Sequence, residues 1–172
     1  MNAAVAEMVR GVPPFPCVRE SMRALSEKAD ILVVSATPVE ALTREWQEHH
    51  LERYVRAIAG QEMGSKTLHL ELAAGAKYAP GHVLMIGDAP GDMEAARANR
   101  ALFYPINPGR EEASWRRFHD EGMHRFVRGT YAGAYEAALI ANFEALLPEV
   151  PPWLRAGESR AGARSGRALV GA

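Results

Sequence analysis

The chain has 172 residues, 48% of them hydrophobic and 24% charged, which suits one globular domain with a real core and is too short for two. A formal net charge of −1 gives no broad positive field, so the composition does not indicate a nucleic-acid partner. The single cysteine, Cys17, excludes an internal disulfide, and no apolar run reaches the ~20 residues that cross a bilayer. We therefore expect a cytoplasmic protein without a membrane partner.

The first half of the chain predicts two helices and two strands. Residues 18–28 have the spacing of a helix, and residues 31–34 form a continuous β-branched run, typical of a strand covered on both faces. Thr37 as a cap, Pro38 at the first helical position and Glu40 three residues after the cap predict a helix from there to about Leu51. Residues 54–59 can form a second, short strand.

The second half continues the alternation of helices and strands. Ser65 predicts a cap for a helix to about Ala74 with Leu68 and Leu72 on one face, although the alternating leucines in this segment also fit a strand. Residues 82–86 and 102–105 predict strands, and residues 93–99, 111–121 and 135–147 predict helices. Residues 151–172, rich in Gly, Ala and Arg, predict a flexible tail. The alternation predicts a parallel, layered α/β sheet with ligands at the carboxyl ends of its strands.

Two carboxylates follow the strand at 82–86. Asp88 and Asp92 would repel each other by roughly 3 kcal/mol at ~5 Å and an effective dielectric near 20, and a hard divalent cation removes that conflict. Mg²⁺ prefers one or two carboxylates together with water and phosphate. We therefore predict Asp88 and Asp92 as Mg²⁺ ligands. The alternative, weighed about equally, is that Asp92 only caps the next helix and Asp88 shapes the turn.

A second group of polar residues follows the other predicted strands. The Ser35 hydroxyl and the neighbouring backbone amide of Ala36 can bind a phosphoryl oxygen at the mouth of a helix. Lys66 lies at a helix start, where a positive charge is unfavourable because it opposes the helix dipole. This position favours a functional role for Lys66. An ordinary turn serine and a solvated surface lysine are the alternatives. The six histidines show no metal-ligand spacing.

These segments, in this order, resemble the haloacid dehalogenase (HAD) superfamily of phosphohydrolases. The resemblance runs from about Gly11 to Pro108: residues 31–35 are similar to the second motif of the family, Lys66 to the third, and residues 83–92 to the fourth. It implies a three-layer, Rossmann-like core over residues 11–150 and Mg²⁺-dependent hydrolysis of a small phosphomonoester through an aspartyl-phosphate. Lys66 and Ser35 would be its catalytic and phosphate-binding side chains, with the Ala36 amide beside them.

The first motif of the family, an apolar strand ending in Asp-x-Asp, is missing. No Asp-x-Asp occurs in the chain, and the only aspartate before Ser35 is Asp30, which precedes its strand. The resemblance therefore implies a chain without its nucleophile and without the central strand, so that either the two neighbouring strands close up or another segment lies between them. Residues 1–10 would be the end of a cap helix. The alternatives are a non-catalytic phosphate- or cation-binding module and one part of a complex completed in trans.

Overall fold

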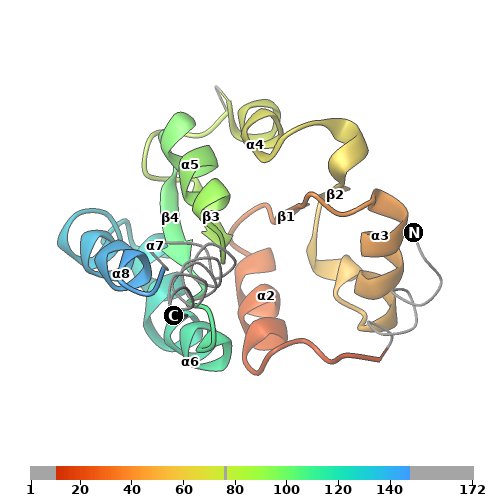
Figure 1. Ribbon diagram of the computed structural model, residues 1–172, viewed down its shortest axis with the longest axis horizontal. Helices are drawn as coiled ribbons and strands as arrows, with labels where there is room; N and C mark the ends of the chain where they lie inside the picture. The colour runs from red at the N-terminus through yellow and green to blue at the C-terminus, as the bar shows by residue number, and fades with distance from the viewer. Residues whose placement is uncertain (1–10, 76, 148–172) are drawn as a thin grey trace, which may run out of the picture.

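The computed structural model describes residues 11–75 and 77–147 and shows a mixed α/β architecture with short parallel strands in two small sheets (Figure 1). Helices and strands alternate along the chain, as the sequence predicts. In order they are α2 (Val18–Ser26), β1 (Leu32–Val34), α3 (Val39–Glu48), η1 (Glu52–Tyr54), β2 (Ala57–Ala59), η2 (Gln61–Met63), α4 (Lys66–Ala74), β3 (Leu84–Gly87), α5 (Pro90–Ala98), β4 (Leu102–Pro105), α6 (Glu111–Arg117), η3 (Phe118–Gly122), α7 (Met123–Val127) and α8 (Ala134–Glu144).

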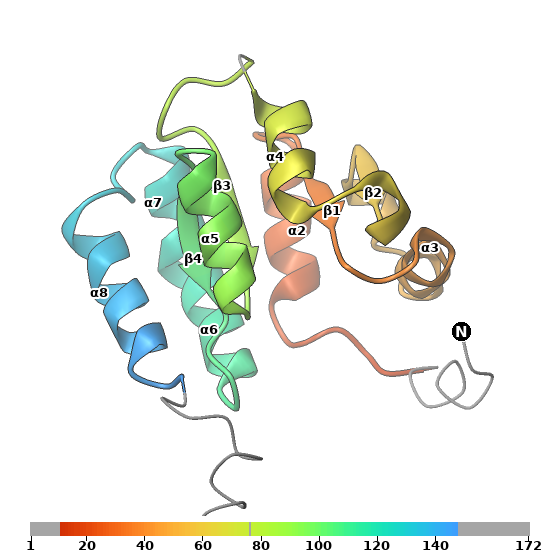
Figure 2. The ribbon, with the colours of Figure 1, turned by 45° about the horizontal axis from the view of Figure 1, so that its top comes forward.

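The four strands form two sheets of two strands each, whereas the sequence predicts one. β1 pairs in parallel with β2, in the register Val33 to Ile58, and β3 pairs in parallel with β4, in the register Met85 to Phe103. In the described part of the chain no ladder joins β1 to β3. Figures 1 and 2 both place β1 and β3 as the inner strands, with β2 and β4 outside them. β1 and β3, the two strands expected on either side of the missing one, have therefore not paired with each other into one sheet.

Helices α2 and α4 connect the two sheets. Met22 of α2 belongs to a small core with Val18 and Leu51, against which Ile31 packs at the start of β1. Leu25, one turn further along α2, packs against the core that contains Tyr104 of β4. Leu70 of α4 lies in a third core, together with Met85 of β3, and Val34 of β1 packs against it. The sheets are thus held side by side by helices rather than by strand pairing.

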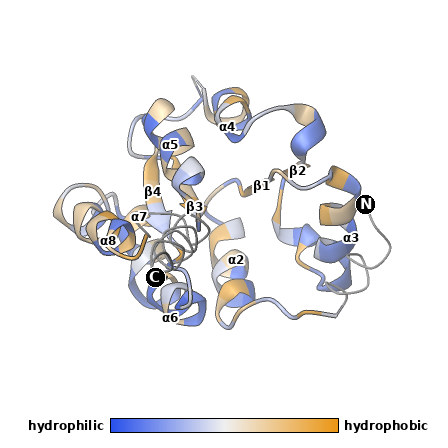
Figure 3. Cartoon of the chain, in the orientation of Figure 1, coloured by the Kyte–Doolittle hydropathy of each residue, from blue (hydrophilic) through white to orange (hydrophobic). Residues whose placement is uncertain are grey.

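Aromatic side chains fill the core of the second sheet. Tyr104 and Phe118 are 1% exposed, and the Tyr104 hydroxyl donates to the carbonyl of Ser114 at 2.7 Å. The Tyr131 hydroxyl donates to the carbonyl of Phe103 at 2.8 Å. Burial raises the pKa of both tyrosines. In Figure 3 the first part of β4 is coloured hydrophobic, whereas α6 is largely hydrophilic. The core around Tyr104 has more buried members than the core around Met22.

The structure corrects two predictions for the first half. The strand expected to be covered on both faces is not: Leu32 is 39% exposed, and Val33 and Val34 are only half-buried. Helix α3 begins at Val39 after Pro38, without a side-chain cap, so Thr37 does not cap it. The prediction of a helix after Ser65 is confirmed, and the strand alternative is wrong.

The second half follows the predicted order with shifted boundaries. The strand predicted from residue 82 begins at Leu84, the helix predicted from residue 93 begins at Pro90, and β4 is as predicted. The helix expected over residues 111–121 contains a π-helical segment, η3, and continues as α7. The interpretations of residues 1–10 and 151–172 lie outside the described residues. Among the helices that are described, none is both long enough and apolar enough to span a membrane.

Candidate functional site

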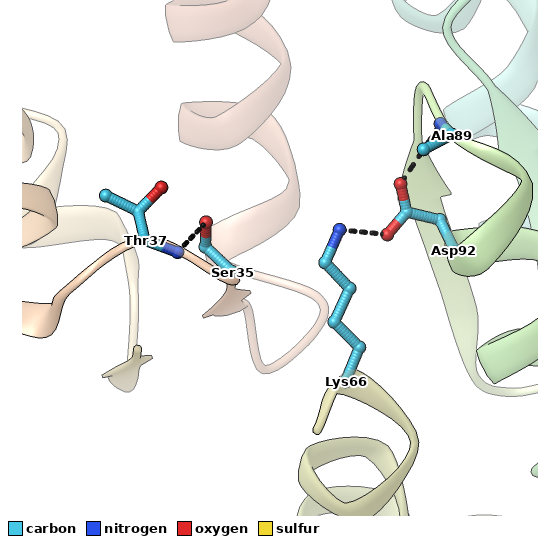
Figure 4. A network of polar contacts seen from close by, with 5 residues as sticks. All are labelled: Ser35, Thr37, Lys66, Ala89 and Asp92. Carbon is cyan, nitrogen blue, oxygen red and sulfur yellow. Dashed lines mark hydrogen bonds and ion pairs between the residues drawn. The ribbon is translucent and has the colours of Figure 1, made fainter. Parts of the chain in front are cut away.

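An ion pair links the two sheets at their carboxyl ends. Lys66 is the first residue of α4, which follows β2, and Asp92 lies in the first turn of α5, which follows β3. The Lys66 ammonium is 2.5 Å from Oδ1 of Asp92 (Figure 4), and the two side chains are 29% and 2% exposed. A buried carboxylate needs such a partner, because an unpaired buried charge costs several kcal/mol, on the order of 3–5. The pair therefore fixes both side chains.

Asp92 also caps the helix on which it lies. Its Oδ2 accepts the backbone N–H of Ala89 at 3.2 Å, so both carboxylate oxygens are engaged. Gly87 makes this packing possible: a Cβ there would lie 2.3 Å from the Cβ of Asp92. A Cβ at Gly91 would meet nothing within 4 Å. Helix capping is the alternative role that the sequence indicates for Asp92, and Asp92 does make this capping contact in the fold.

Lys66 keeps donors for a ligand. An ammonium has three N–H groups, and in the described structure one of them is used, by Asp92. The positive charge at the N-terminus of α4, which is locally unfavourable, is offset by the Asp92 carboxylate. The half-buried ammonium can therefore present its remaining N–H groups to an anionic oxygen.

Ser35 lies just after β1, on the other side of Lys66 from Asp92 in Figure 4. Its Oγ accepts the N–H of Thr37 at 3.1 Å, and its own N–H donates to the carbonyl of Ala59 at 3.0 Å. The hydroxyl hydrogen is not needed for either bond and remains available to an acceptor. Ala36 is exposed. The serine thus behaves as a turn residue that can still donate one hydrogen bond.

Glu62 occupies the helix N-terminus that the sequence predicts as an anion site. Its Oε2 accepts the N–H of Val39 at 3.0 Å, at the start of α3. Gly60 allows this approach, because a Cβ there would lie 2.5 Å from the nitrogen of Val39. An internal carboxylate therefore satisfies the first turn of α3. Nothing in the sequence indicates this role, which depends on a contact between residues 23 apart.

Asp88 is the carboxylate that remains accessible. It is exposed directly after β3, and within residues 11–75 and 77–147 no side-chain hydrogen bond or ion pair engages it. Among these residues no three His, Cys, Asp or Glu side chains are grouped as a metal cage. A cation here would be held by one or two carboxylates, which is a donor set that suits Mg²⁺. Asp88 is a carboxylate of that kind, whereas both oxygens of Asp92 are engaged by Lys66 and by the Ala89 amide.

Asp30 lies at the opposite end of the strands. Its Oδ2 accepts the Tyr78 hydroxyl at 2.5 Å, and its Oδ1 accepts Nε of Arg56 at 2.9 Å. These hydrogen bonds, the one from Tyr78 first, lower the pKa of Asp30. Because Asp30 precedes β1 and Tyr78 precedes β3, this contact links the amino ends of the two sheets as Lys66–Asp92 links their carboxyl ends.

Comparison of the chain with protein-family models, with curated proteins and with solved structures finds no significant match in any of the three. What the site can do therefore follows from the chemistry of its own residues.

Proposed function

We propose that this chain forms most of the core of a HAD-like, Mg²⁺-dependent phosphohydrolase that acts on a small phosphorylated substrate, and that it lacks the attacking carboxylate. The observation that carries the proposal is the Lys66–Asp92 pair at the carboxyl ends of β2 and β3, together with the exposed Asp88 directly after β3. The half-buried Lys66 ammonium and the exposed Asp88 carboxylate both follow carboxyl ends of strands, which is where parallel α/β folds bind ligands.

The charges explain why a divalent cation is part of the proposal. Asp92 neutralises the charge of Lys66, and Asp88 adds a negative charge. A phosphate dianion would be repelled by this net charge unless a cation balanced it. Mg²⁺, when bound, supplies that balance and polarises the phosphoryl oxygens.

Each residue of the chain then has a distinct role toward the phosphoryl group. Lys66 donates its remaining N–H groups to phosphoryl oxygens, and Asp92 holds the ammonium in position. The Ser35 hydroxyl and the Ala36 amide donate from the end of β1. Asp88 holds the cation.

The reaction itself requires a group that this sequence does not contain. In the HAD scheme an aspartate attacks phosphorus and expels the alcohol, and water then releases phosphate from the enzyme. No Asp-x-Asp occurs among the 172 residues. We therefore expect this chain alone to bind phosphate and Mg²⁺ without turnover.

A second candidate function is a non-catalytic phosphate- or cation-binding module. The engaged state of the site favours it, since Asp92, Lys66 and Ser35 each satisfy an internal partner. A phosphatase assay with p-nitrophenyl phosphate and Mg²⁺ bears on both candidates. Turnover by this chain that Asp88→Ala abolishes would contradict the absence of a nucleophile and exclude the module.

Binding of inorganic phosphate tests the proposed site directly. In a ³¹P NMR titration with Mg²⁺ present, we expect Asp88→Asn and Lys66→Ala to weaken binding at least about tenfold, or ~1.4 kcal/mol. Lys28→Ala, a change at an exposed lysine, serves as the control and should bind like the wild type.

Stability must be measured alongside binding, because Lys66→Ala leaves Asp92 buried without its partner. If that variant unfolds, the exposed Asp88→Asn carries the test alone. Phosphate binding that does not depend on Mg²⁺, or that Asp88→Asn leaves unchanged, would overturn the proposal.

A further inference from the structure

A small cavity lies where β4, α6 and α8 meet. Its volume is about 150 Å³, and its lining includes Pro105 at the end of β4, Asn107 in the following loop and Leu139 of α8. Sites for drug-sized ligands measure roughly 300–1,000 Å³, so this cavity admits only a small molecule. Pro105 and Leu139 are both buried and give the cavity an apolar side.

Helix α6 provides the polar side of the cavity. Four of the lining residues have the spacing of one helix face: Arg110, Ala113, Ser114 and Arg117. Arg110 directly precedes the helix and Arg117 ends it, so their Cα atoms lie about 10 Å apart along its axis. Ala113, between them, has a small side chain that leaves room for a ligand.

The two arginines have no acidic partner in the described part of the chain. Neither Arg110 nor Arg117 takes part in any of its ion pairs. Two acidic side chains near them in sequence are engaged elsewhere: Glu111 accepts a backbone N–H at 2.8 Å, and Glu121 accepts Nε of Arg125 at 2.8 Å. Of the described residues that line the cavity, none is acidic. Two uncompensated positive charges favour a dianion.

Asn107 adds a polar atom that lacks a partner. Its backbone N–H donates to Oγ of Ser114 at 3.0 Å, whereas its side-chain Oδ1 is buried without a hydrogen-bond partner among the described residues. Buried polar atoms in proteins are ordinarily satisfied, and an amide oxygen is satisfied by an N–H or O–H donor. A ligand that carries a hydroxyl group can supply such a donor.

We infer that this cavity binds a short dicarboxylate that carries a hydroxyl group. Each carboxylate pairs with one guanidinium group, in the bidentate geometry that arginine favours. The hydroxyl donates to Oδ1 of Asn107, and the carbon chain lies against Pro105 and Leu139. Inorganic phosphate fits less well, because it has no carbon chain to cover the apolar side. The inference does not depend on the proposed function, since Ser35, Lys66, Asp88 and Asp92 do not line the cavity.

The test uses the full chain, with L-malate as the probe. Isothermal titration calorimetry is run at physiological ionic strength with EDTA, which removes metal ions that malate would chelate. We expect saturable binding, weakened at least about tenfold by Arg110→Gln and by Arg117→Gln. Arg116→Gln is the matched control, because Arg116 is an exposed arginine of the same helix that does not line the cavity. This variant should bind malate like the wild type.

Two further measurements test the shape and the hydroxyl contact. Ala113→Leu fills the cavity and leaves both arginines in place, so it should abolish malate binding. Succinate, which lacks the hydroxyl group, should bind the wild type at least about tenfold more weakly than malate. Asn107→Ala should bind the two acids equally.

Methyl NMR locates the bound acid. The Leu139 methyl signals should shift with malate and saturate with it, whereas those of Leu70, which lies in another core, should not. Four results would overturn the inference: no saturable binding, equal weakening by Arg116→Gln, equal affinity for succinate, or unshifted Leu139 methyls. Phosphate binding measured by ³¹P NMR should be unchanged in Arg117→Gln, so failure of this inference and failure of the proposed function are separate outcomes.

Discussion

Asp30 contributes to the stability of the fold in a pH-dependent way. Its pKa in the folded protein lies below the ordinary value of 3.8, first because of the Tyr78 hydroxyl and then because of Arg56. A carboxyl with a lowered pKa stabilises the fold above its unfolded pKa, and that stabilisation is lost as pH falls through the folded pKa. The link between the amino ends of the sheets therefore weakens in acid.

We expect Asp30→Asn to be less stable than the wild type near neutral pH, and the difference to shrink as pH falls below 3.8. Denaturant unfolding over a pH series measures it. Tyr78→Phe should reproduce most of the effect, because the Tyr78 hydrogen bond is the largest cause of the shift. A difference that is the same at every pH would contradict this assignment.

The sequence identifies several site residues one by one but not their partners. Lys66 and Asp92 stand out because each lies in or just before the first turn of a helix predicted after a strand, yet their pairing across 26 residues is a tertiary contact. The local bond of Ser35 spans two residues and is of a kind that serine often makes in turns. Glu62 could not be found in this way, since its acceptor role depends on where α3 lies relative to the loop after β2.

The junction of β3 and α5 depends on Gly87, which has no side chain. Gly87→Ala would place a Cβ 2.3 Å from the Cβ of Asp92, so strand and helix must separate. We expect a loss of about 1–3 kcal/mol in unfolding free energy, as for overpacked sites, together with weaker phosphate binding as Asp92 moves from Lys66. Denaturant unfolding and the ³¹P titration measure the two effects.

Gly91→Ala is the matched control for that variant. It lies four residues further on, within α5, and a Cβ there meets nothing within 4 Å. Alanine favours a helix over glycine by up to about 1 kcal/mol, so Gly91→Ala should be neutral or stabilising. Equal destabilisation by both variants would contradict the packing argument at Gly87.

Helix α4 shows what an apolar pattern predicts and where it fails. Ser65 accepts the N–H of Leu68 at 3.2 Å, so the predicted cap is confirmed. The pattern also pairs Leu68 with Leu72, but both are exposed, at 39% and 70%, and Leu70 packs into the core instead. The spacing of apolar residues defines a helix face, but the neighbouring elements decide whether that face is buried.

For the whole molecule, the sequence predicts the strands but not their division into two sheets. A run such as Ile31-Leu32-Val33-Val34 indicates a strand because of its β-branched residues. Which strand lies beside it is decided by chain segments far away, and a run of this kind is equally apolar whether one edge is paired or both are. Whether both faces of β1 are covered likewise depends on distant elements, and the expected cover is wrong because Leu32 is 39% exposed.

The two sheets should differ in local stability because their cores differ in size. The core beside β1 has Val18, Met22 and Leu51 as its buried members, whereas β4 lies among buried aromatic rings. We expect the paired amides of Val33 and Ala59 to exchange at least about tenfold faster than those of Met85 and Tyr104, which corresponds to ~1.4 kcal/mol. Native-state hydrogen exchange measures this, and equal protection throughout would show one cooperative unit.

The Lys66–Asp92 pair has a further consequence for folding order. Lys66 follows the strand pair with the smaller core, and Asp92 lies between the strands with the larger one, so the pair forms only after both halves have docked. A refolding chain would regain its aromatic packing before it regains this contact. Conversely, partial opening of the smaller half separates lysine from aspartate while the larger half is still intact, so ligand binding would disappear before the fold does.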